Sequence, residues 1–166
     1  VDEFDPHEPF DTPDEYARLY DPDWDGPPLI WPPYGKDCIR RGVITEREGR
    51  QIRARYGAKL TMIDRWFGKV LDALDRNGLW DDTLIAVTTD HGHYLGEKDI
   101  WGKPGVPLFQ TIAHIPMMVA APGVQAGTCD ALTTSVDLFA TIVDVFDAAR
   151  RHDVERTLPD AQLPDD

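Results

Sequence analysis

A run of β-branched and aliphatic side chains, followed directly by a polar triplet, constrains this chain more than any other feature. Residues 83–89 read TLIAVTT and lie between Asp81-Asp82 and Asp90-His91-Gly92. A continuous apolar run between polar residues predicts a strand buried on both faces, as in parallel sheets. In open α/β sheets, ligands bind beyond the carboxyl ends of the strands. Asp90 and His91 are therefore expected at a binding edge.

The segment before this strand predicts one long helix over residues 45–77. Thr45 and Glu48 have the spacing of a capping box, in which each side chain accepts a hydrogen bond from the other residue's backbone. Apolar residues then recur at helical spacing, and Asn77-Gly78 predicts the end of the helix. We expect this helix to flank the strand at residues 83–89.

The segments after the strand complete an α/β order. A glycine-punctuated loop leads to residues 115–120 (IPMMVA), which predict a second buried strand, and residues 137–149 predict a helix capped by Ser135 or Asp137. Helix, buried strand, loop, buried strand and helix together predict an α/β fold over residues 45–148.

The two ends of the chain have a different composition. Residues 1–44 are rich in proline and aspartate, which predicts extended loops with one short helix near residues 13–19. Residues 149–166 are polar and show no periodicity, so we expect a tail there.

Asp90 and His91 are the strongest candidates for a metal site. A carboxylate and an imidazole suit a divalent cation, because oxygen favours hard ions and nitrogen tolerates transition metals. The glycine that follows lets the backbone turn sharply and lets a substrate approach. The alternative is an aspartate that caps the loop beside a surface histidine.

Lys103 and His7 are candidates for contacts with a substrate. Lys103 lies in the loop WGKPG, where its ammonium can neutralise a bound oxyanion. His7 lies in DPHEP, and the flanking prolines provide the rigidity that positioning for catalysis requires. The alternatives are a solvated lysine and a loop histidine bonded to a neighbouring aspartate. His93 and His114 are weaker candidates.

Charge and hydropathy narrow the range of partners. The chain has 30 acidic and 17 basic residues, a formal net charge of −13. This balance argues against nucleic acid and against an anionic membrane surface, both of which need basic neutralisation. No apolar run is long enough to cross a bilayer, and no basic leader opens the chain, so the compartment stays undetermined. The two cysteines, Cys38 and Cys129, form no CxxC pair and give no zinc signature.

The stretch LTMIDRWFGKVLDALDRNGLWDDTLIAVTTDHGHYLGEKDIWGK resembles the second half of the sulfatase family, within the alkaline-phosphatase-like superfamily. The shared order is an Asp-bearing helix, an L-W-D-D-T link, a hydrophobic strand, T-D-H-G and then G-K. HIPMMVAAPG and SVDLFATIVDVF are similar to the strand and helix that follow in the family. DEFDPHEPFDTPDEY resembles its H-x-P region, so the resemblance covers residues 1–148.

This resemblance implies a fold, a cofactor and a set of roles. The implied fold is a mostly parallel sheet sandwiched by helices. Asp90 and His91 would hold a divalent metal, with Ca²⁺ the first candidate and Mn²⁺ the second. Lys103 would contact the sulfate or phosphate oxygens, and His7 would bind the same group and could protonate the leaving oxygen.

The chain also departs from the family pattern. The family nucleophile is a Cys or Ser in C/S-x-P-x-R that matures to formylglycine, and neither Cys38 nor Cys129 has this context. The aspartate pair that completes the metal shell would precede the H-x-P region. We therefore expect an incomplete, internal piece of a sulfatase whose N-terminal portion carries the nucleophile. The alternatives are a phosphonate monoester or phosphodiester hydrolase of the same superfamily, and an inactive acidic α/β fragment.

Overall fold

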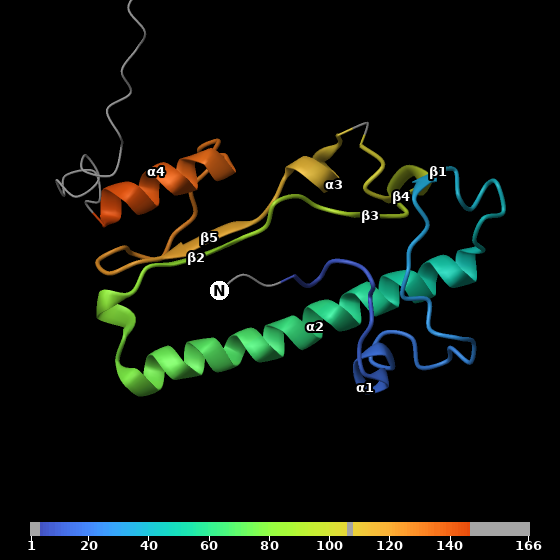
Figure 1. The fold of residues 1–166 in the computed structure, drawn as a ribbon, viewed down its shortest axis with the longest axis horizontal. Coiled ribbons are helices and arrows are strands. Elements are labelled where there is room, and N and C mark those ends of the chain that lie inside the picture. Colours follow the sequence, from blue (N-terminus) through green and yellow to red (C-terminus); the bar gives the residue numbers. More distant parts are fainter. Residues whose placement is uncertain (1–3, 106–107, 147–166) are drawn as a thin grey trace, which may run out of the picture. The chain divides into compact units, whose positions relative to one another are not determined.

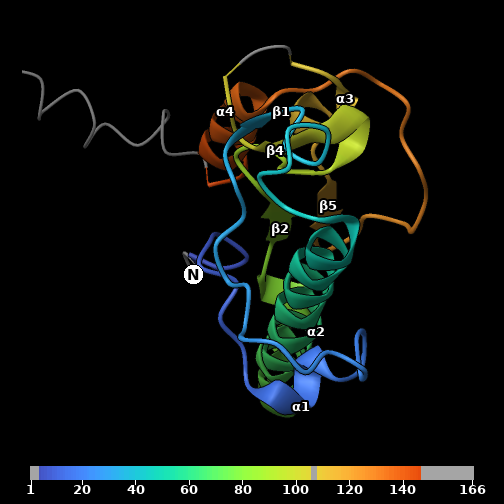
Figure 2. The same cartoon turned by 90° about the vertical axis from the view of Figure 1, so that its right-hand side faces the viewer.

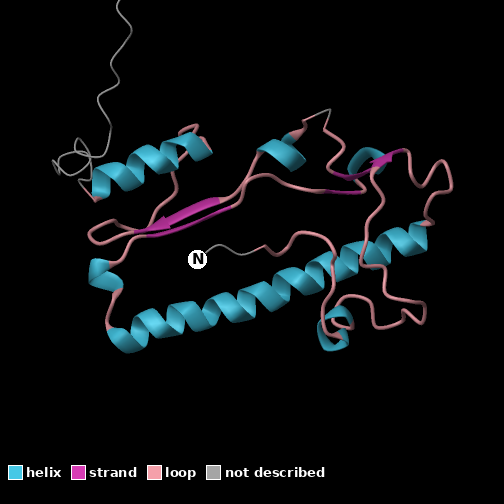
Figure 3. Cartoon of the chain, viewed as in Figure 1, coloured by secondary structure: helices cyan, strands magenta, loops and turns pink. Residues whose placement is uncertain are grey.

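The computed structural model of the chain describes residues 4–105 and 108–146 (Figure 1). The chain divides into two compact units, residues 1–124 and 125–166, and each is described by itself. Helices and short strands alternate along the first unit, as the colouring in Figure 3 shows. The α/β class expected from the sequence is therefore present.

Helix α2, Glu46–Asn77, is the longest element and confirms the helix predicted at residues 45–77. The Thr45 side chain accepts from the Glu48 backbone N–H, and Glu48 accepts in return from the Thr45 backbone, so both halves of the capping box form. At the other end, Gly78 adopts the left-handed conformation, with φ of 61°, that commonly closes a helix. These local signals set both ends of the helix where the sequence places them.

The first half of α2 carries the core. Its Ile52 packs with Phe10, Cys38 and Trp101, and the Trp101 side chain is fully buried. Gly49 leaves room for that indole, because a Cβ at this position would lie only 3.0 Å from the Trp101 ring. The short helix α1, Asp14–Ala17, packs on α2 in a second cluster that includes Ala58 (Figure 2).

A small antiparallel sheet lies beside this core. It contains β1 (Gly35–Lys36), β4 (Ile100–Gly102) and β3 (Tyr94–Leu95), in the order β1-β4-β3. β4 is fully buried, and it holds Trp101 against α2. The loop predicted between the two longer strands therefore contains ordered strands, which bring residues 94–102 onto the core.

The two longer strands are β2, Ile85–Thr88, and β5, Met117–Ala120, and both fall within predicted strands. They pair with each other antiparallel, with Ile85 opposite Ala120, so the prediction of a parallel pair is wrong for these strands. Neither strand is buried on both faces: β2 is half-buried, and β5 is mostly exposed. Among the described elements, α2 packs chiefly on α1 and β3, so the expectation that it flanks a central strand at 83–89 is also wrong.

Short turns of helix join these elements: 3-10 turns at Trp80–Asp82 and Glu97–Asp99, and α3 at Gln110–Ala113. In the second unit, α4 spans Ser135–Val145 and is capped by Thr134 with Asp137, one residue before the earlier of the two predicted caps. The end of the predicted helix and the tail expected at 149–166 lie outside the described residues. None of the helices in the described ranges has both the length and the apolar composition needed to cross a membrane.

We expect Trp101→Ala to destabilise the first unit by about 3–5 kcal/mol, because it removes the largest fully buried side chain and leaves a cavity against Gly49. Urea unfolding followed by far-UV circular dichroism measures this loss. Trp31→Ala is the matched control, because Trp31 is 64% exposed and should change stability little. Equal losses for both variants would contradict the assignment of Trp101 to the core.

Candidate functional site

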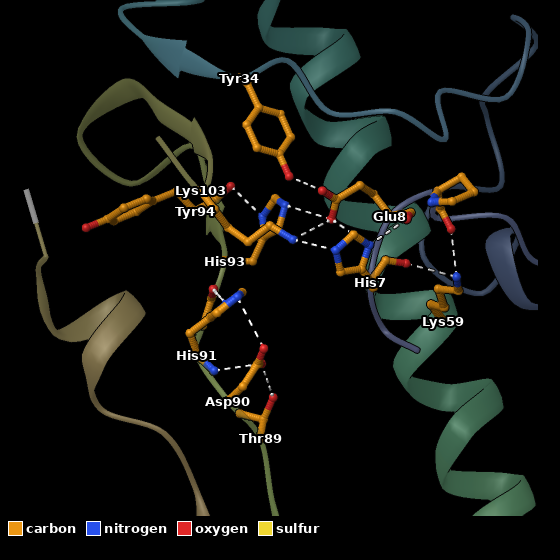
Figure 4. Close-up of polar contacts among 12 residues, drawn as sticks. His7, Glu8, Tyr34, Lys59, Thr89, Asp90, His91, His93, Tyr94 and Lys103 are labelled. Atoms are coloured by element: carbon orange, nitrogen blue, oxygen red, sulfur yellow. Dashed lines mark hydrogen bonds and ion pairs between the residues drawn. The ribbon is translucent and has the colours of Figure 1, made fainter. Parts of the chain in front are cut away.

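A buried lysine of α2 fixes the loop that carries His7. The Lys59 side chain is only 5% exposed, and its Nζ lies 2.5 Å from Asp5 Oδ1. The same ammonium donates to the backbone oxygens of His7, at 3.1 Å, and Pro9, at 2.6 Å (Figure 4). A buried ammonium needs such partners, because an unpaired charge in the interior is costly. The loop at residues 5–9 is therefore tied to the helix through its backbone.

The structure brings His7 and Lys103 together across 96 positions of sequence. Lys103 follows directly after β4, and its Nζ lies 2.9 Å from His7 Nε2. An ammonium can only donate, so His7 Nε2 accepts and Nδ1 carries the ring proton. That proton is donated to the Glu8 backbone oxygen at 2.7 Å. Both ring nitrogens of His7 are thus engaged, which fixes the orientation of the ring.

Glu8 is a member of this site that sequence reasoning missed. Its side chain is 5% exposed; Oε2 lies 3.2 Å from Lys103 Nζ, and Oε1 accepts from the Tyr34 hydroxyl. Desolvation alone would raise the pKa of Glu8, but its own backbone N–H and the Lys103 ammonium lower it below the ordinary value. Its place beside His7 between two prolines was the available signal, since a rigid loop can bury a neighbour of the histidine.

His93 also faces this cluster and is more central than the sequence suggested. Its side chain is 8% exposed, with Nε2 lying 3.6 Å from Glu8 Oε2. Nδ1 donates to the Tyr94 backbone oxygen at 2.9 Å, whereas Nε2 is buried without a hydrogen-bond partner. Burial lowers the pKa of His93 and outweighs the opposing influence of Glu8, so the ring is neutral near pH 7.

Asp90 and His91 lie just beyond β2, at the end where the sequence placed them. The His91 backbone N–H donates to Asp90 Oδ1 at 2.8 Å, and the Asp90 side chain is 80% exposed. Desolvation alone would raise the pKa of Asp90, but this bond and the nearby imidazole lower it, so the carboxylate stays ionised.

Gly92, the third residue of the triplet, has a role in packing. A Cβ at Gly92 would lie 1.9 Å from the Thr111 backbone oxygen, and the Gly92 N–H donates to Ile112. Only glycine allows this close approach of the loop to α3. The structure therefore gives this glycine a packing reason, where the sequence suggested room for a substrate.

One pocket of about 460 Å³ is lined by three of the four predicted residues. Asp90 and His91 line it together with Lys103, and the remaining wall comes from Tyr94, Pro104, Gly105, Leu108, Ile112 and Ala113. Lys103 therefore belongs both to this pocket and to the cluster of His7 and Glu8 (Figure 4). The four residues singled out from the sequence are connected through this one side chain.

The donors at the pocket fit part of a divalent-metal shell. Asp90 offers an ionised carboxylate, and the His91 imidazole lies beside it, with Nε2 3.4 Å from Asp90 Oδ2. Within residues 4–105 and 108–146, no cluster of three or more His, Cys, Asp or Glu side chains is placed to hold an ion. Hard divalent ions take about six or more ligands, so further donors are needed for tight binding.

Comparison with known proteins gives a consistent result. The family model described as Sulfatase matches residues 4–148. Human iduronate 2-sulfatase is 32% identical over 167 residues, which cover 87% of this chain and 29% of that protein. Choline-sulfatase of Rhizobium meliloti (strain 1021) is 35% identical over 102 residues, covering 61% of this chain and 20% of the relative.

A further relative belongs to the wider superfamily. The multifunctional alkaline phosphatase superfamily protein PehA of Trinickia caryophylli is 36% identical over 122 residues, covering 65% of this chain and 23% of that protein. The chain spans between a fifth and three tenths of the length of these curated relatives.

We expect Glu8→Gln to lower stability by about 1–3 kcal/mol near neutral pH, because it removes a charged acceptor from two donors. The pKa of Glu8 is lowered in the folded chain, so its contribution is present above the ordinary value of 4.5 and is lost as pH falls through the lower folded value. The gap between wild type and variant should therefore shrink below pH 4.5.

Urea midpoints measured across this range test the prediction. Glu15→Gln, at an exposed glutamate, is the control and should lie close to wild type throughout. A gap between wild type and Glu8→Gln that is independent of pH would show that the folded site does not favour the ionised carboxylate.

Proposed function

Because this chain belongs to the sulfatase family, we propose that it forms the metal-binding and oxyanion-binding part of a sulfuric ester hydrolase. The observation that carries the proposal is the position of Lys103. Its side chain lines the pocket of Asp90 and His91, while its Nζ lies 2.9 Å from His7 Nε2. A tetrahedral anion in the pocket would therefore lie within reach of a cation, a proton-carrying pair and a metal-binding pair.

Lys103 and His7 have complementary roles in this proposal. The Lys103 ammonium stabilises negative charge on the sulfate oxygens and on the ester oxygen as its bond to sulfur breaks. The proton between Lys103 Nζ and His7 Nε2 is available to the departing oxygen, because a general acid must lie within hydrogen-bond reach of the group that it protonates. The Glu8 backbone oxygen keeps the His7 ring oriented during this transfer.

Asp90 and His91 would hold the divalent metal, with Ca²⁺ the first candidate and Mn²⁺ the second. When bound, such an ion acts as a Lewis acid that polarises an oxygen of the ester or of the nucleophile. The remaining ligands and the formylglycine nucleophile are proposed to come from a part of the enzyme outside these 166 residues, since C/S-x-P-x-R does not occur in this sequence.

A second candidate function is hydrolysis of a phosphonate monoester or phosphodiester. The similarity to PehA, a multifunctional alkaline phosphatase superfamily protein, favours keeping this alternative. Lys103 and His7 suit a tetrahedral phosphorus oxyanion as well as a sulfate, because both present oxygens of similar geometry. Comparing an aryl sulfate with an aryl phosphonate as substrates separates the two.

We expect Mn²⁺ to bind weakly and selectively beside β2. As the paramagnetic ion is added, NMR signals of residues 89–92 should broaden first, and Asp90→Asn should remove this selectivity. First broadening at the acidic loop around Asp21–Asp25 would contradict a metal site at Asp90 and His91.

We expect the 166-residue chain by itself to hydrolyse neither an aryl sulfate nor an aryl phosphonate at an enzymatic rate, with Ca²⁺ or Mn²⁺ added. Loss of a catalytic nucleophile costs about six orders of magnitude in serine proteases, and two side chains hold a hard ion poorly. Release of the phenol is followed by absorbance. Metal-dependent turnover that Asp90→Ala abolishes would mean that this chain contains its own nucleophile.

A further inference from the structure

The buried carboxylate behind Lys103 sets the charge that an incoming anion meets. Glu8 Oε2 lies 3.2 Å from Lys103 Nζ, and Glu8 does not line the pocket, so it acts on a ligand without touching it, through its charge and through its hold on the lysine. Its side chain is 5% exposed, which limits the screening of its charge by water.

The other groups around Glu8 add little charge. From the N-terminal loop, His7 Nδ1 lies 3.5 Å from Glu8 Oε2, and the His7 ring is hydrogen-bonded as a neutral tautomer. Beside β3, His93 is buried with Nε2 unprotonated, and before β1 the Tyr34 hydroxyl donates to Glu8. Among these groups one ammonium faces one carboxylate, so their charges nearly cancel, while the ionised Asp90, which lines the same pocket as Lys103, adds a further negative charge.

We infer that Glu8 is a positioning residue that makes this oxyanion recess select singly charged esters over doubly charged ones. The inference rests on the proposed function, because it requires an oxyanion at Lys103. Glu8 holds the ammonium toward His7 and at the same time cancels its charge at longer range. A ligand with one negative charge gains the hydrogen bonds of Lys103, whereas a second charge is repelled by Glu8 without a further cation to balance it.

Sulfate and phosphate monoesters differ in this respect. Both are tetrahedral, but a sulfate monoester carries one negative charge, and a phosphate monoester carries close to two above its second pKa of about 6. One extra charge about 6 Å from a carboxylate, at an effective dielectric of about 20 to 60, corresponds to about a 5- to 100-fold loss of affinity. Glu8 therefore shifts the preference of the recess toward sulfate monoesters and other monoanions, such as phosphodiesters, and away from phosphate monoesters.

The test compares methyl sulfate with methyl phosphate at about pH 8, where the phosphate is doubly charged. Binding to the 166-residue chain, without added metal, is followed by NMR at the Lys103 side chain and the His7 ring. We expect wild type to bind methyl sulfate more tightly, and Glu8→Gln to reduce this preference by about fivefold or more. Repulsion from Asp90 is present in wild type and variant alike, so it cancels in the comparison.

Two variants control for overall charge and for shape. Glu15→Gln removes one exposed negative charge elsewhere and should leave the preference unchanged. Glu8→Asp keeps the buried charge and should restore most of the preference that Glu8→Gln loses, which a purely structural role for the side chain would not produce. An unchanged preference in Glu8→Gln would overturn the inference and leave the proposed oxyanion site intact.

A second arm uses wild type alone and so does not depend on the folding of a variant. At about pH 5 methyl phosphate is singly charged, whereas Glu8 remains ionised because its pKa is lowered. The preference for methyl sulfate should therefore decline by about fivefold or more, and a preference that persists would overturn the inference. If neither ligand shifts Lys103 or His7 at either pH, the oxyanion site of the proposed function fails, and this inference fails with it.

Discussion

The ammonium of Lys59, buried on α2, is the contact on which the candidate site depends. It binds Asp5 and two backbone oxygens of the loop that carries His7 and Glu8. The cost of burying this charge is offset only when all of these partners are in place, so the loop has one strongly favoured position. The geometry of His7 therefore follows from the helix, which holds the backbone of its loop.

The same helix also fixes the opposite wall of the site. The Trp101 indole packs against Gly49, and Arg53 donates to the Leu95 backbone oxygen at 3.0 Å. These contacts hold β3 and β4 on α2, and Lys103 follows β4 directly. One rigid element thus positions both His7 and Lys103, which explains how two residues so far apart in sequence meet at 2.9 Å.

Local sequence signals predicted where the helices and strands lie better than they predicted which elements pair or pack with one another. The capping box at Thr45 and the glycine at 78 define α2 because they act within a few residues of the helix ends. The β-branched run at 83–89 predicted a strand but not its partner, because strand pairing is decided by distant segments. β2 pairs antiparallel with β5, and its half-buried side chains differ from the double burial expected of a central parallel strand.

The residues of the candidate site divide in the same way, into those that the sequence predicts and those that only the tertiary structure reveals. Asp90, His91, Lys103 and His7 were found from their places at a strand end and in punctuated loops, and then through the order of family motifs, whereas Glu8 and Lys59 were not. A charged residue is buried only when the tertiary structure supplies partners. The proline-flanked loop is an indirect signal for Glu8, and no local pattern predicts the burial of Lys59. Glu8 and Lys59 support the other four residues, and support of this kind becomes visible only when the segments are assembled.

Lys59 holds its loop mainly through backbone oxygens, so the shape of the loop does not depend on which side chain stands at position 8. Of the three groups that it binds, two are backbone oxygens, at His7 and Pro9, and these are present whatever side chains the loop carries. The side chain at position 8 takes no part in this anchor. A lineage could therefore exchange the residue at position 8 and retune which anions the recess accepts, while the frame that presents His7 stays the same. A single substitution at position 8 is therefore enough to change the anion preference of the site without changing its frame.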